Sequence, residues 1–189
     1  MLLLIPILAN VILNRREPVK DPSALKRVKM TWKTDFEFSS RYTGLAMETR
    51  EFTTHSPEET IALGQNLAKL LAPPKLVLLR GELGAGKTTL AKGIAEGFQA
   101  ASQDDVTSPT FTLVHEYRGP GVKLYHIDLY RVDTPRQLET LGLDDLIGES
   151  SVLLIEWGEK FARFVGERDV EIALERTGEN ERRIRVISD

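Results

Sequence analysis

Residues 75–88 read KLVLLRGELGAGKT, an apolar run followed by a glycine-rich segment. The run at 75–80 is typical of a short strand that is buried on both faces of a parallel sheet. Residues 81–88 match the pattern G-x-x-x-x-G-K-[ST], in which backbone N–H groups surround phosphate oxygens at the start of a helix. Apolar residues at 90, 94 and 98 predict that helix over 89–98. The whole stretch therefore predicts a strand, a phosphate-binding loop (P-loop) and a helix.

The segment before this stretch carries the signals of a helix start. Ser56 is a suitable N-cap, Pro57 suits the first helical position, and Glu59 lies three residues after the cap. Apolar side chains at helical spacing follow, and we expect Pro73-Pro74 to end the helix.

The segments after the P-loop helix read mainly as strands. We expect strands at 111–117, 122–129, 151–157, 170–174 and 183–187. Gly119-Pro120-Gly121 predicts a turn between the first two, and the polar segment 177–180 predicts a hairpin between the last two. The expected fold is an α/β, P-loop NTPase fold: a mixed, mostly parallel sheet flanked by helices, with a C-terminal β-hairpin.

A nucleotide site can be read from the residues at these strand ends. In a P-loop, Lys87 reaches the β and γ phosphates and the Thr88 hydroxyl contacts Mg²⁺. Asp128 and Glu156 each follow a buried strand, where sites of open α/β sheets lie, so they are the candidate acids for holding Mg²⁺ and orienting water. A surface or capping carboxylate is the alternative interpretation of each.

Four further features near these acids allow more than one interpretation. The segment Ser108-Pro109-Thr110 either senses the γ phosphate through its hydroxyls or simply starts a strand. Arg131 either pairs with Asp128, approaches phosphate, or is solvated, and spacing alone favours the last. His126 is interpreted as a packed or hydrogen-bonded imidazole rather than a metal ligand, and Trp157 as a structural residue rather than one that stacks on a cofactor.

Composition and charge limit the class of protein. The chain has 189 residues, 25 Lys plus Arg, 28 Asp plus Glu and no cysteine, as expected for one modest globular domain. The lack of cysteine excludes disulfides and thiolate chemistry, and it is compatible with the cytoplasmic location that we expect. Residues 1–46 carry eight basic and four acidic side chains, whereas residues 47–189 carry 17 and 24. An acidic domain is not expected to hold nucleic acid by bulk electrostatics.

Residues 1–46 differ from the rest of the chain, and we expect them to be an extension outside a domain at 47–189. The apolar run at 1–13 is shorter than the roughly 20 residues that cross a membrane, and its flanks do not fit a cleaved signal peptide. The extension is interpreted as disordered or as translated from a start upstream of Met30 or Met47. A tail that binds a membrane surface or a partner, or a targeting segment, are the alternatives.

Five short motifs identify a resemblance to a known family. They are GELGAGKTT at 81–89, SPTFTL at 108–113, YHIDLYR at 125–131, LGLDD at 141–145 and IEW at 155–157. In order and spacing they resemble the TsaE family, formerly YjeE, the P-loop ATPases of bacterial tRNA threonylcarbamoyladenosine biosynthesis. The resemblance covers about residues 50–188 and is far more specific than the P-loop alone.

The resemblance implies a Mg²⁺-dependent ATPase that acts with TsaD and TsaB. In that family TsaD transfers the threonylcarbamoyl group to the adenosine beside the anticodon of tRNAs that read codons beginning with A. ATP hydrolysis supports that cycle, and the tRNA is reached through the complex.

The family's motifs also imply roles for individual residues. The implied phosphate-binding residues are Gly84, Ala85, Gly86, Lys87, Thr88 and Thr89, with Thr110 in a switch-like loop. Thr88 and Glu156 would bind Mg²⁺, and the catalytic set is Lys87, Asp128 and Glu156, with Asp128 near the attacking water. The base is expected near Ser56, Pro57 and Asn180.

Other functions remain open at this point. A small-molecule kinase is expected to carry an arginine-bearing lid, but the turn at 119–121 is too short and residues 138–149 contain no arginine. A GTPase is disfavoured because no N-K-x-D motif follows the P-loop. A nucleotide-gated interaction module with negligible turnover is the alternative from a different class.

Overall fold

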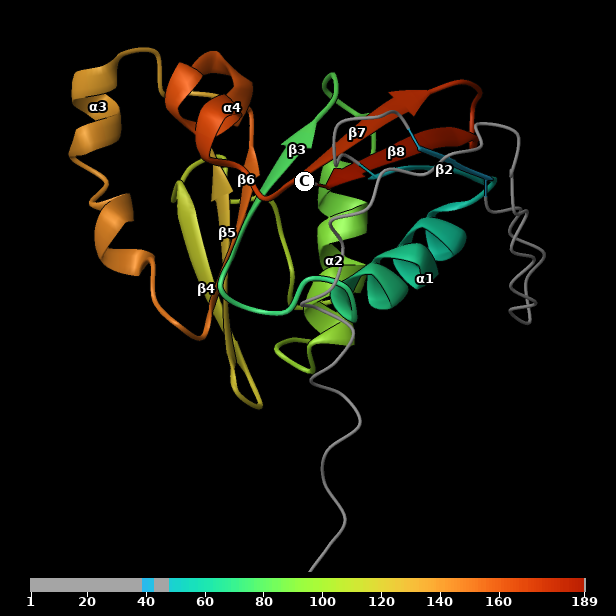
Figure 1. Ribbon diagram of the computed structural model, residues 1–189, viewed down its shortest axis with the longest axis horizontal. Coiled ribbons are helices and arrows are strands. Elements are labelled where there is room, and N and C mark those ends of the chain that lie inside the picture. Colours follow the sequence, from blue (N-terminus) through green and yellow to red (C-terminus); the bar gives the residue numbers. More distant parts are fainter. Residues whose placement is uncertain (1–38, 43–47, 189) are drawn as a thin grey trace, which may run out of the picture.

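A computed structural model describes residues 39–42 and 48–188, which form an eight-stranded sheet with helices on both faces (Figure 1). The elements are β1 (Ser39–Tyr42), β2 (Glu48–Thr54), α1 (Pro57–Ala68), β3 (Lys75–Arg80), α2 (Lys87–Gly97), β4 (Val114–Gly119), β5 (Val122–Asp128), α3 (Pro135–Glu139), η1 (Leu143–Leu146), β6 (Ser151–Glu156), η2 (Gly158–Lys160), α4 (Ala162–Glu167), β7 (Val170–Arg176) and β8 (Arg182–Ser188). The extension expected at 1–46 lies outside the described residues except for β1. Within the described chain, no helix has the length and apolar character needed to cross a membrane.

The sheet is mixed, as the sequence predicts, but it is not mostly parallel, because four of the seven pairs between the described strands are antiparallel. Its strand order is β1-β2-β8-β7-β3-β6-β5-β4, and the four central strands β7, β3, β6 and β5 are parallel. The outer strands pair antiparallel, which includes the expected hairpins β4–β5 and β7–β8. Because β3, β5 and β6 are parallel, their carboxyl ends meet at one edge, where the P-loop, Asp128 and Glu156 follow.

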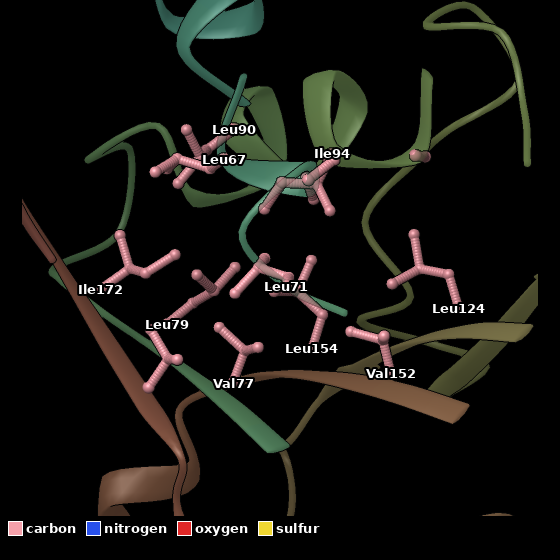
Figure 2. Packing of buried hydrophobic residues seen from close by; sticks show 14 of the residues in the cluster. Leu67, Leu71, Val77, Leu79, Leu90, Ile94, Leu124, Val152, Leu154 and Ile172 are labelled. Atoms are coloured by element: carbon pink, nitrogen blue, oxygen red, sulfur yellow. The ribbon is translucent and has the colours of Figure 1, made fainter. Parts of the chain in front are cut away.

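The larger part of the core lies between the sheet and the pair α1 and α2. Figure 2 shows Leu67 of α1 and Leu90 and Ile94 of α2 against apolar side chains of the central strands. Alternate residues of each strand, such as Val77 and Leu79 of β3, face these helices. This packing fixes the start of α2 against the carboxyl ends of β3, β5 and β6.

The opposite face of the sheet packs against the short helices. Leu76 and Leu78 of β3 join a second buried cluster that includes Phe161 and Phe164 from the α4 region. In Figure 1, α3 and α4 lie on one side of the sheet, across from α1 and α2. Burial on both faces explains why β3 and β6 read as continuous apolar runs.

Several element boundaries differ from the expected ones, most of them by one or two residues. Helix α1 begins at Pro57 with Ser56 as its cap, as expected, but it ends at Ala68 rather than at the two prolines. The backbone N–H groups of residues 69–71 donate hydrogen bonds to the carbonyl oxygens three residues earlier instead of four. This change of pattern ends the α-helix before the prolines. Helix α2 begins at Lys87, two residues before the expected start, so Lys87 and Thr88 lie in its first turn.

The strand expected at 111–117 is also shorter, because β4 begins only at Val114. Leu113 has a positive φ of 65°, and its N–H donates to the Pro109 carbonyl at 2.6 Å. Residues 109–113 therefore form a turn that doubles back before the strand.

Helices α1 and α2 are in backbone contact through glycines. A Cβ atom placed on Gly93 would lie 2.0 Å from the Ile61 carbonyl oxygen, and one on Gly64 would lie 2.5 Å from the Leu90 carbonyl oxygen. Any side chain at Gly93 must push the two helices apart, and the start of α2 would move with them.

We expect Gly93→Ala to lower the free energy of unfolding by about 3 kcal/mol, because overpacking at a backbone contact cannot be relieved by a side-chain rotation. The control is Gly166→Ala in α4, where a Cβ would meet nothing within 4 Å. That change should be neutral or stabilising by up to about 1 kcal/mol, since alanine is the better helix former. Urea unfolding followed by circular dichroism measures both, and equal effects would contradict the close helix contact.

Candidate nucleotide site

The P-loop at 81–88 connects β3 to α2 and is shaped by glycine. Gly86 has a φ of 104° and forms the N-cap of α2, a conformation that other residues adopt only with strain. Gly81 has a φ of 146°, and a Cβ on it would lie 2.5 Å from the Leu174 carbonyl oxygen. The loop is therefore held against β7 and leads directly into the positive N-terminal end of α2, where an anion such as phosphate is favoured.

Lys87 lies inside this loop and is only 5% exposed. Its ammonium group donates to the carbonyl oxygens of Gly81 at 2.6 Å and Glu82 at 3.0 Å, and lies 4.3 Å from the centre of the Trp157 ring. Burial lowers the pKa of Lys87, and nearby carboxylates oppose that shift. The structure thus places a desolvated cation where a phosphate chain would meet it.

Two buried carboxylates face the start of α2 from adjacent strands. Asp128 ends β5 and Glu156 ends β6, and the two are direct neighbours in the parallel register. Each is 3% exposed. Because side chains alternate along a strand, both lie on the face of Leu124 and Leu154, which pack in the cluster under α2. The sequence-based expectation that both acids lie at the P-loop edge is consistent with this register.

Glu156 is bonded to the first turn of α2. Its Oε1 accepts a hydrogen bond from the Thr88 hydroxyl at 3.1 Å and contacts Nε2 of His126 at 2.8 Å. His126 is 1% exposed, so the sequence interpretation of a hydrogen-bonded imidazole is confirmed. The two residues expected to bind Mg²⁺ are therefore in direct contact.

Asp128 is bonded to the loop at 108–113. Its Oδ2 accepts from the hydroxyls of Ser108 at 3.0 Å and Thr110 at 2.6 Å, while Oδ1 accepts from the Tyr130 backbone N–H at 2.9 Å. Of the two interpretations of the Ser-Pro-Thr segment, the simple start of a strand is wrong, since these hydroxyls bind the candidate acid instead. A loop that changes position would therefore change the surroundings of Asp128 directly.

The donor set at Thr88 and Glu156 fits a magnesium ion bound together with a nucleotide. Among the described residues, no cluster of three or more His, Cys, Asp or Glu side chains is arranged to hold a metal by itself. A hydroxyl oxygen beside a carboxylate suits Mg²⁺, which takes oxygen ligands, keeps several waters and uses substrate phosphates for the rest. The fit is thus to a metal–nucleotide complex rather than to a permanent metal centre.

The remaining phosphate candidates line the same loop. Ala85 is buried, and its N–H donates to the Glu82 carbonyl at 3.1 Å, which stabilises the bend of the loop. Gly84 has a φ of 78° and Thr89 lies in the first turn of α2 after Thr88.

The residues expected near the base lie on two segments that the structure brings together. His55 at the start of α1 contacts Glu181 of the β7–β8 turn at 3.3 Å, and Asn180 lies exposed in the same turn. Ser56 uses its hydroxyl to cap α1 by accepting from the Glu59 N–H at 3.1 Å, and Pro57 follows it in the first turn. These residues and the P-loop lie at the same end of the helix pair.

Two contacts in the site were not predicted from the sequence. Trp157, interpreted as structural, has a positive φ of 62° that directs the chain away from β6 and brings its ring to the Lys87 ammonium. Arg131 lies over the Phe111 ring, 4.2 Å from its centre. The position of Trp157 directly after Glu156 was the one signal that could have indicated the first contact.

The sequence and fold of the chain are similar to those of known proteins. Residues 54–184 match the family model "Threonylcarbamoyl adenosine biosynthesis protein TsaE". The tRNA threonylcarbamoyladenosine biosynthesis protein TsaE of Bacillus subtilis is 38% identical over 138 residues, covering 73% of this chain and 85% of that protein. The protein of the same name from Aquifex aeolicus is 38% identical over 137 residues, covering 72% and 95%. A crystal structure of YdiB from Bacillus subtilis superposes with a TM-score of 0.60 at 33% identity, covering 75% of this chain and 86% of that one.

Proposed function

The chain belongs to the TsaE family of tRNA threonylcarbamoyladenosine biosynthesis, and from that membership and the geometry of the site we propose that it is a Mg²⁺-dependent ATPase. The observation that carries the proposal is the pair Asp128 and Glu156, side by side at the ends of β5 and β6. Glu156 is hydrogen-bonded to the P-loop threonine, and Asp128 is held by a loop that can respond to the γ phosphate.

Each group has a chemical role in this proposal. The P-loop N–H groups and Lys87 bind the phosphates of ATP and stabilise the charge that develops during phosphoryl transfer. Thr88 and Glu156 hold Mg²⁺, which when bound neutralises phosphate charge. Asp128 accepts a hydrogen bond from the attacking water and orients it toward the γ phosphorus. Buried carboxylates suit these roles because a site that excludes bulk water strengthens each interaction.

The proposed partners are TsaD and TsaB, and the proposed substrate of the complex is tRNA. TsaD would carry out the threonylcarbamoyl transfer, and ATP binding and hydrolysis by this chain would support its cycle. The acidic balance of residues 47–189, with 17 basic and 24 acidic side chains, supports a protein that reaches tRNA through its partners. A cytoplasmic location remains part of this proposal.

The test is a product analysis with ATP that carries a label on its γ phosphate. With Mg²⁺ we expect the label to appear slowly as free inorganic phosphate, and chelation of Mg²⁺ should stop its release. Label transferred to a small metabolite would instead indicate a kinase. Tight ATP binding without any product would indicate a nucleotide-gated interaction module.

A further inference from the structure

His126 lies in the middle of the sheet yet carries a polar ring. It belongs to β5, between β4 and β6, and is 1% exposed on the side of the sheet that packs under α2. Its β6 neighbour in the register is Leu154, so an apolar residue would suit the surroundings of this position. A histidine here needs a reason other than packing.

The hydrogen bond that the His126 ring makes to Glu156 explains why a histidine occupies this position. Nε2 lies 2.8 Å from Oε1 of Glu156. An ionised carboxylate only accepts, so Nε2 carries the hydrogen and donates it. The other nitrogen, Nδ1, is buried and has no hydrogen-bond partner among the described residues. Leaving a buried polar atom unpaired is unfavourable, so the bond made by Nε2 must be what retains the imidazole.

The two carboxylates of the site differ in how their oxygens are used. Asp128 accepts hydrogen bonds on both oxygens. Glu156 accepts from His126 and Thr88 on Oε1, and no side-chain or backbone donor of the described chain bonds to Oε2. One oxygen of Glu156, Oε1, is thus held by hydrogen bonds within the protein. The other, Oε2, remains available as a ligand for a metal ion.

We propose that His126 is a positioning residue, which orients Glu156 so that its unbonded oxygen and the Thr88 hydroxyl together face Mg²⁺. This inference rests on the proposed function, because it concerns the same metal–nucleotide site. His126 touches neither nucleotide nor metal in this assignment. It acts by holding the carboxylate in one rotational state, as groups that hydrogen-bond to metal ligands commonly do.

The test measures metal binding rather than turnover. Mn²⁺ replaces Mg²⁺, and its affinity for the complex of the full chain with ADP is followed by electron paramagnetic resonance. We expect His126→Leu to weaken Mn²⁺ binding by about tenfold or more, which is typical for the loss of such a partner. Affinity for ADP in the presence of EDTA should stay within about twofold of the wild type. His126→Gln, whose amide N–H can reach toward Glu156, should restore most of the Mn²⁺ affinity.

The matched control is His115→Leu. His115 lies directly opposite His126 in the β4–β5 pair, but its ring contacts Thr112 and Tyr117 instead of Glu156. This variant also removes a histidine from the same hairpin, and it should bind Mn²⁺ like the wild type.

The outcomes separate the two proposals. If wild-type protein binds Mn²⁺ no better with ADP than without it, the metal site of the proposed function is wrong. If the wild type does bind Mn²⁺–ADP and His126→Leu binds it equally well, only the role of His126 is wrong. Should His126→Leu fail to fold, His126→Asn against His126→Gln decides, because the shorter amide cannot reach Glu156. Equal, wild-type-like affinities of these two variants would overturn the inference.

Discussion

Asp128→Asn is expected to slow ATP hydrolysis by at least about 100-fold while ATP affinity stays within a few-fold of the wild type. The amide has the shape of the carboxyl group: its oxygen can still accept from the Tyr130 N–H, and its NH2 group can donate to the hydroxyl oxygens of Ser108 and Thr110. It has lost the negative charge with which Asp128 accepts a hydrogen bond from the attacking water and orients it, and a side chain positioned in this way contributes roughly 10²- to 10⁴-fold to a rate. Phosphate release and equilibrium ATP binding measure the two quantities separately.

Asp133→Asn is the control for this variant. Asp133 lies five residues further along the same connection, is exposed, and pairs with Lys160 at 2.8 Å. Its neutralisation should leave the rate unchanged. Loss of ATP binding in Asp128→Asn would contradict the assignment to water rather than to nucleotide. If tRNA modification by the complex persists in this variant without hydrolysis, nucleotide binding alone is sufficient.

Lys87→Met is expected to weaken ATP binding by about 10- to 100-fold. Methionine keeps an unbranched apolar side chain against the Trp157 ring but lacks the ammonium group. Hydrogen bonds to charged groups contribute about 1.5–3 kcal/mol, which corresponds to this loss of affinity. Titration with a non-hydrolysable ATP analogue measures the affinity.

Lys92→Met provides the matched control for Lys87→Met. Lys92 lies in the same helix, α2, and is only partly buried. Thermal unfolding should accompany both titrations, because Lys87 also bonds to the carbonyls of Gly81 and Glu82. Unchanged ATP affinity in folded Lys87→Met would show that nucleotide does not use the P-loop in the expected way.

The local sequence of the P-loop region was sufficient to predict the centre of the fold. Residues 75–80 form β3 and the glycine pattern forms the loop, since both signals depend on neighbours in the sequence. Strand β2 was not predicted, because Glu48–Thr54 has a single large apolar residue and is stabilised mainly by its pairing with β8. The short helices α3 and α4 were likewise missed, being too short for a clear period.

The candidate acids could be found from their places after buried strands, but their partners could not. The contact of His126 with Glu156 joins residues 30 positions apart and depends on the register of β5 against β6. The bonds from Ser108 and Thr110 to Asp128 require the turn at 109–113, which a positive φ at Leu113 produces against the usual preference of leucine. Register and local strain of this kind arise from tertiary packing.

Central to the proposed function is that this chain hydrolyses ATP in support of a tRNA-modifying complex. The most direct measurement is steady-state phosphate release from ATP and Mg²⁺ by the purified protein, alone and after addition of TsaD and TsaB. We expect slow release alone and a clear acceleration with both partners, because a partner that orders the loop at 108–113 would fix the surroundings of Asp128. An unchanged rate with the partners, together with transfer of phosphate to a metabolite, would contradict the account in favour of a kinase.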